Sequence, residues 1–117
     1  MAFGTAAGRA VLEDWIVNQN HGQVSISAHN GNPGADGTAN EVSGGSYARA
    51  SAPDWQLHST DKSVSLVGNI DITSMPEDDV THLGIWCGET FFVSVDCNDV
   101  SVEAGETLRI SGITITA

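Results

Sequence analysis

Short segments in which apolar and polar residues alternate, separated by turn-forming residues, constrain the fold of this chain more than any other feature. In the clearest segment Val24, Ile26 and Ala28 alternate with serines, and the same period of two returns in residues 63–67. Residues two apart lie on one face of a β-strand, so each segment predicts a half-buried strand. Thirteen glycines and many Ser, Thr and Asn residues lie between these segments. Such residues favour turns, so the chain is predicted to be mainly β.

The predicted strands follow one another at intervals of about ten residues, which is typical of a single antiparallel β-sandwich or a small barrel. The most hydrophobic strands are predicted at residues 80–87 and 90–95, and Gly88-Glu89 between them has the right length for a tight hairpin. Further strands are predicted at residues 46–50, 55–57, 63–67, 70–72, 100–102 and 108–115. Residues 29–40 are predicted to form a long surface loop.

The last predicted strand changes its alternation at a glycine. Leu108 and Ile110 have one parity, whereas Ile113 and Ile115 have the other, and Gly112 lies at the change. A glycine at such a point is typical of a β-bulge or of a strand that crosses from one sheet to another.

One short helix is predicted over residues 5–18, before the β region of residues 23–117, within a single domain of residues 1–117. Thr5 is a suitable N-cap, and Gly22 follows the polar end of the segment. The apolar residues of one helical face are Val11, Leu12, Trp15 and Ile16.

The charge of the chain restricts the classes of partner. Fifteen acidic residues and only four basic ones give a formal net charge of −11. Nucleic acids and anionic membranes both require a positive surface, so neither is an expected partner. The sequence has neither an apolar run long enough to span a membrane nor a signal peptide, and we expect synthesis in the cytoplasm. Cys87 and Cys97 are therefore predicted to be reduced, buried thiols.

No pattern of polar residues predicts a metal, a cofactor or a catalytic site. The histidines lack the short spacing of zinc ligands; they are His21, His29, His58 and His82. Oxygen atoms of the long loop offer calcium as an alternative, but turn chemistry explains them better; they belong to Asn30, Asn32, Asp36 and Asn40. Ser46 lacks the following glycine of a nucleophile elbow, so the chain is not expected to be an enzyme.

Three stretches resemble a family of small tailed-bacteriophage virion proteins, often labelled tail-fibre or minor tail proteins. They are residues 26–49, which end in NEVSGGSYAR, residues 80–86 (VTHLGIW) and residues 102–110 (VEAGETLRI). With the N-terminal helix, the resemblance covers nearly the whole chain. It implies a structural protein of the phage particle with a β-sandwich body.

Chain size and the lack of a repetitive fibre shaft favour, within that family, a capsid decoration protein that binds the major capsid protein on the outer surface of the virion. The alternative is a minor tail or tail-fibre component that binds a receptor or carbohydrate. Other virion proteins are the expected partners, and a homo-oligomer, preferably a trimer, is expected. Partner contacts are predicted in the long loop and at exposed aromatic or arginine residues, which dominate binding hot spots. The candidates are Trp15, Asn32, Pro33, Asp36, Glu41, Tyr47, Arg49 and Trp86.

Overall fold

The computed structural model describes residues 11–58 and 63–116, which form one short helical segment and a set of antiparallel strands. The helical segment is η1 (Glu13–Val17). The strands are β1 (Val24–His29), β2 (Ala50–Ser51), β3 (Trp55–His58), β4 (Ser63–Leu66), β5 (Ile70–Ile72), β6 (Asp78–Cys87), β7 (Thr90–Val102), β8 (Leu108–Ile110) and β9 (Thr114–Thr116). The predicted fold class, mainly β with one short helix, is confirmed.

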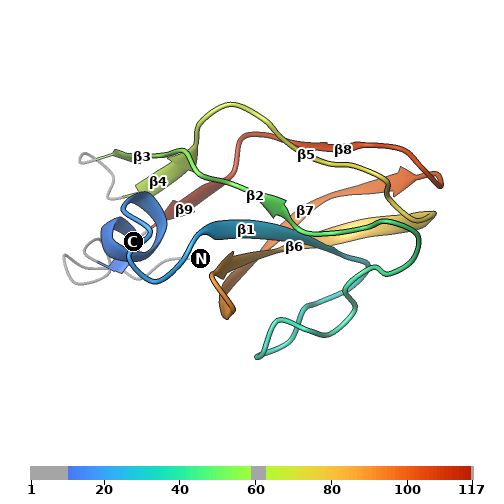
Figure 1. Cartoon of the computed structure of the whole chain (residues 1–117), viewed down its shortest axis with the longest axis horizontal. Helices are drawn as coiled ribbons and strands as arrows, with labels where there is room; N and C mark the ends of the chain where they lie inside the picture. Colours follow the sequence, from blue (N-terminus) through green and yellow to red (C-terminus); the bar gives the residue numbers. More distant parts are fainter. Residues whose placement is uncertain (1–10, 59–62, 117) are drawn as a thin grey trace.

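The strands form three sheets, with the strand orders β2-β1-β6-β7, β3-β4-β9 and β5-β8. Figure 1 shows the two smaller sheets on one side of the four-stranded sheet, with η1 at the end near β3 and β4. The sheets do not close on one another, so the barrel alternative is wrong. The prediction failed because strand alternation shows which residues are buried but not whether the first and last strands pair.

Aliphatic side chains from all three sheets form one buried cluster. Ile26 of β1 and Ile85 of β6 are register partners, and both are fully buried. Ile72 of β5 and Ile115 of β9 join the same cluster from the smaller sheets. Burial of each such side chain contributes about 1.5–3 kcal/mol, so this cluster is the main source of stability.

Helical structure covers residues 11–17, within the predicted range 5–18, whereas the proposed cap Thr5 lies outside the described residues. Leu12 and Ile16 are fully buried and Trp15 is partly buried, as the predicted apolar face requires. The last turn is a π-helix, in which the Asn18 backbone N–H donates to the Glu13 carbonyl at 2.9 Å.

The hairpin predicted at Gly88-Glu89 is confirmed: β6 and β7 pair from Cys87 and Thr90 onward. The separate strand predicted at residues 100–102 is wrong, because β7 continues through that segment to Val102. An irregularity in the pairing with β6 lies between Val80 and His82, and it interrupts the alternation that the prediction relied on.

The change of parity at Gly112 is a crossing between sheets, which is one of the two alternatives predicted there. β8 pairs with β5, whereas β9 pairs with β4 in a different sheet. Gly112 has a φ of 73°, in the left-handed region that glycine adopts without steric cost.

Two local predictions about the long loop are wrong. His29, the first residue of the predicted surface loop, is instead the last residue of β1 and is fully buried. The strand predicted at residues 46–50 is limited to Ala50–Ser51, because side-chain hydrogen bonds instead of strand pairing fix Tyr47 and Arg49.

The cysteines are both free, and Cys87 is buried as predicted, while Cys97 is only partly buried. Burial raises the pKa of the Cys87 thiol to about 11, so this thiol is protonated at neutral pH. Among the described residues, no helix has the length and apolar character needed to cross a membrane.

Candidate functional site

The segment from Asn30 to Arg49 is here called the β1–β2 loop. Its first part lies below the four-stranded sheet, on the side away from the two smaller sheets (Figure 1). Its two halves are joined by backbone hydrogen bonds: Asn30 N–H donates to the Asn40 carbonyl at 2.9 Å, and Ala39 N–H donates to the Pro33 carbonyl at 3.0 Å. The Asn40 side chain also donates to the Asn32 carbonyl at 3.0 Å. The loop is therefore an ordered structure with its own hydrogen bonds.

Short polar side chains form the turns of the loop. The Asn32 side-chain oxygen accepts the Gly34 N–H at 2.9 Å. One oxygen of Asp36 accepts both the backbone N–H and the hydroxyl of Thr38, and these bonds lower the pKa of its carboxyl group. Asn32 and Asp36 are exposed, so turn chemistry explains their positions while their outer faces stay accessible.

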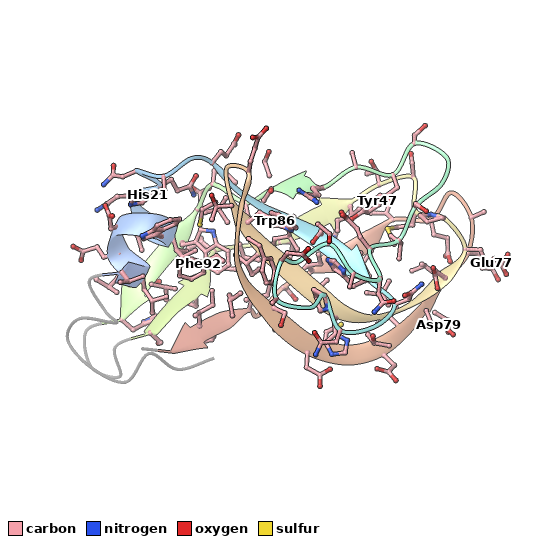
Figure 2. All side chains as sticks on the ribbon, turned by 90° about the horizontal axis from the view of Figure 1, so that it is seen from below. His21, Tyr47, Glu77, Asp79, Trp86 and Phe92 are labelled. Atoms are coloured by element: carbon pink, nitrogen blue, oxygen red, sulfur yellow. The ribbon has the colours of Figure 1, made fainter. Side chains whose placement is uncertain are left out.

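A cluster of four side chains connects the loop to β6. It consists of Glu41, Tyr47, Arg49 and Trp86 and is here called the Glu41 cluster. Arg49 donates two hydrogen bonds to the two carboxylate oxygens of Glu41, at 3.0 and 2.9 Å. Its guanidinium carbon lies 3.8 Å from the centroid of the Trp86 ring, which is a cation–π contact. The Tyr47 hydroxyl accepts the Ala28 N–H and donates to Glu41. Figure 2 shows Trp86 near the middle of the molecule and Tyr47 to the right of it.

The electrostatics of the cluster keep Glu41 ionised. Partial burial raises the pKa of its carboxyl group. The hydrogen bonds from Arg49 and Tyr47, together with the Arg49 charge, lower this pKa by a larger amount, so the net shift is downward. The pKa of Tyr47 is raised, mainly by burial, so its hydroxyl stays protonated and can donate. Because charge-assisted bidentate bonds are strong and directional, the cluster fixes the orientation of Arg49 over Trp86.

A buried chain of hydrogen bonds lies beneath the loop. Trp86 Nε1 donates to the Ser27 hydroxyl at 2.9 Å, and this hydroxyl lies 2.7 Å from His29 Nε2. On the other side of the ring, His29 Nδ1 lies 2.8 Å from the Ala39 carbonyl. A carbonyl oxygen only accepts, so Nδ1 carries the proton and Nε2 accepts from Ser27. With His29 neutral, the side chains of Trp86, Ser27 and His29 all have hydrogen-bond partners.

Gly84 and Gly37 leave the space that this packing requires. A Cβ atom on Gly84 would overlap the Ser27 hydroxyl and would lie 3.0 Å from His29 Nε2. A Cβ atom on Gly37 would overlap the Phe91 ring, which itself contacts the Trp86 ring edge-on at 5.3 Å between centroids. The loop therefore packs against the aromatic residues of β6 and β7.

Seven of the eight predicted contact residues lie in the β1–β2 loop or in the Glu41 cluster; the exception is Trp15. Trp15 is stacked on His21 with 3.7 Å between ring centroids, and its ring is 5.9 Å from that of Phe92. Figure 2 shows His21 and Phe92 to the left of Trp86 and Tyr47. Trp86 is only 4% exposed and Pro33 is buried, so these two residues support the loop from inside. Contact of the other residues with a partner stays a prediction.

Sequence reasoning missed Ser27, His29 and Phe91. Ser27 and His29 occupy the polar phase of β1, which predicts an exposed face, yet both are fully buried. The available signal was the length of the loop, because connections longer than about 12–15 residues usually carry a function or pack on the protein.

Three of the histidines that were considered above as metal ligands, and judged unsuitable, have other partners. His21 pairs with Asp14 at 2.6 Å, His58 lies 2.6 Å from the Ser65 hydroxyl, and His82 lies 2.8 Å from the Thr81 hydroxyl. Within residues 11–58 and 63–116, no group of three or more His, Cys, Asp or Glu side chains is arranged to hold a metal ion.

The family described as podophage GP4 fiber I protein gp80 matches residues 14–111. The matched region includes the β1–β2 loop, the Glu41 cluster and all strands from β1 to β8. No curated protein and no solved structure matches the chain.

The packing of Gly37 against Phe91 predicts different effects for two glycine substitutions. Gly34 and Gly37 have the same φ of 78°, but a Cβ on Gly34 would make only an ordinary contact with Ala39 at 3.5 Å. Gly34→Ala should cost about 1–2 kcal/mol of unfolding free energy, from backbone strain alone. Gly37→Ala should cost about 1–3 kcal/mol more, from overpacking. Urea denaturation measures both values, and equal losses would contradict the packing of Phe91 on the loop.

The hydrogen-bond chain predicts the protonation state of His29. Burial lowers the pKa of His29 in spite of the bond to Ala39 and the nearby Glu41 charge. The unfolded chain therefore takes up a proton as the pH falls through about 6.5 while the folded chain does not, and stability should decrease below that pH. Nitrogen-15 NMR at pH 7 should show His29 neutral with the proton on Nδ1. A proton on Nε2, or a His29 pKa above that of an unfolded histidine, would contradict this arrangement of hydrogen bonds.

Proposed function

The chain belongs to the family of podophage GP4 fiber I protein gp80, and from this membership we propose that it is a structural component of the tail fibre of a bacteriophage particle. The family match carries the proposal because it spans 98 positions, from 14 to 111, and so includes nearly every described element. A phage structural protein agrees with the resemblance found in the sequence. The description of the family names a fibre protein, so the match supports the tail-fibre alternative and gives no support to capsid decoration.

We propose that the β1–β2 loop is the surface through which the protein contacts its partner. Support comes from the way the loop is held: Glu41 and Arg49 fix its base, and Phe91 packs against its Gly37. A loop that is ordered before binding loses little conformational entropy in a complex, which favours affinity. The exposed faces of Asn32 and Asp36 would supply polar contacts.

The proposed role is binding without catalysis. Support comes from the uses of the reactive side chains of the site: Ser27 and His29 bond to each other and to Trp86 and Ala39, and Glu41 is bound by Arg49 and Tyr47. The proposed partners are other proteins of the particle or a molecule on the host surface, and a homotrimer stays a prediction. We also propose that the sheets form an irregular β-sandwich, because the two smaller sheets lie over the larger one (Figure 1).

Electron microscopy of phage particles labelled with antibodies against this chain tests the proposal. The account predicts gold label on the tail fibres and none on the capsid faces. Particles that lack the protein, produced from a genome with its gene disrupted, serve as the control for specific labelling. Label distributed over the capsid lattice would contradict the fibre assignment and would restore the decoration hypothesis.

A further inference from the structure

Strand β7 is an edge strand of the four-stranded sheet. The strand order β2-β1-β6-β7 places β6 on one side of β7, and in the part of the chain that is described no strand pairs with its other side. At 13 residues β7 is also the longest of the described strands. The free edge of a strand presents N–H and C=O groups that can pair with another extended chain.

A groove of about 530 Å³, here called the β7 groove, runs between β7 and residues 108–114. Its apolar lining includes Val80, Leu83, Val95, Val100, Ile110 and Ile113. Val100 is 40% exposed, an unusual degree for a large apolar residue next to a core. Its volume is in the range of ligand sites in proteins, so the groove can accept several side chains of a bound segment.

The irregular pairing of β7 with β6 lies beside this groove. Val80 pairs with Val100 and His82 pairs with Asp96, so residues 97–99 together lie opposite the single residue Thr81. Bulges of this kind change the direction of side chains at sheet edges. Asp96 lines the groove and Asp99 is exposed beside it.

The charges around the groove that have no opposite partner are negative. Arg109 is the only cationic residue of the lining, and Asp71 already binds it with two hydrogen bonds of 2.9 and 3.2 Å. Beyond Val100, further carboxylates surround the end of β7 (Figure 2 labels two of them); they are Glu77, Asp78, Asp79, Glu103 and Glu106. A ligand of this edge therefore meets apolar side chains in the groove and uncompensated negative charge around it.

We propose that the β7 groove binds an extended segment of a partner protein in which lysine or arginine alternates with apolar residues. The segment would pair with the free edge of β7, insert its apolar side chains into the groove, and place its cations near Asp96 and Asp99. A second copy of this chain fits less well, because it carries a net charge of −11 and like charges opposite each other destabilise strand pairs.

A synthetic peptide that alternates lysine and valine over ten residues is the probe, and NMR chemical-shift titration of the whole chain is the measurement. The shift changes are expected at residues 94–100 and 108–114. Replacing both carboxylates, D96K with D99K, should weaken binding about tenfold, because two attractive contacts become repulsive. A peptide of the same composition with its lysines and valines in separate blocks should bind at least tenfold more weakly.

The control variant combines D54K with E89K, which changes the net charge equally but alters exposed residues outside the groove. It should change the dissociation constant less than twofold. Equal weakening by both double variants, shift changes elsewhere, or equal binding of a glutamate–valine peptide would overturn the proposal. Self-association of the chain through β7, seen by ultracentrifugation with shift changes at residues 94–100, would overturn it as well. None of these outcomes bears on the fibre assignment, which the labelling of particles tests separately.

Discussion

The Arg49 guanidinium group is the connection on which the β1–β2 loop depends. It binds both oxygens of Glu41, and its central carbon lies 3.8 Å from the centroid of the Trp86 ring, so that one side chain joins two parts of the loop to the four-stranded sheet. A lysine could supply the charge but not the planar pair of donors or the stacking surface. Because Glu41 is partly buried, its carboxylate requires these donors, and the loop in turn excludes water from the face of β1 beneath it.

The covered face of β1 explains why strand alternation misjudged this part of the molecule. Val24, Ile26 and Ala28 face the core as predicted, whereas Ser27 and His29 were expected to face solvent. They are buried because a loop of twenty residues folds back over them, and Ala39 from that loop supplies a hydrogen-bond partner. Periodicity records which face is apolar, but it contains no information about a segment that covers the polar face.

Features set by neighbouring residues were predictable, and features set by distant pairing were not. The hairpin at Gly88-Glu89 and the sheet crossing at Gly112 depend on local geometry. The hairpin was predicted correctly, and the crossing is one of the two alternatives predicted at Gly112. The division into three sheets depends on pairs such as Ile72 with Leu108, which are far apart in the sequence. For the candidate site, the sequence predicted the loop and most of the residues of the Glu41 cluster. It did not predict the buried hydrogen bonds of Ser27 and His29 that hold the loop in place.

Native-state hydrogen exchange tests the central role of Arg49 most directly. The amides of Asn30, Ala39 and Val42 donate the backbone hydrogen bonds of the loop and report its local opening. Arg49→Lys should accelerate their exchange at least tenfold, whereas Arg109→Lys, which alters an exposed bidentate pair with Asp71, should leave them unchanged. Equal exchange at these amides in wild type and in Arg49→Lys would contradict the account.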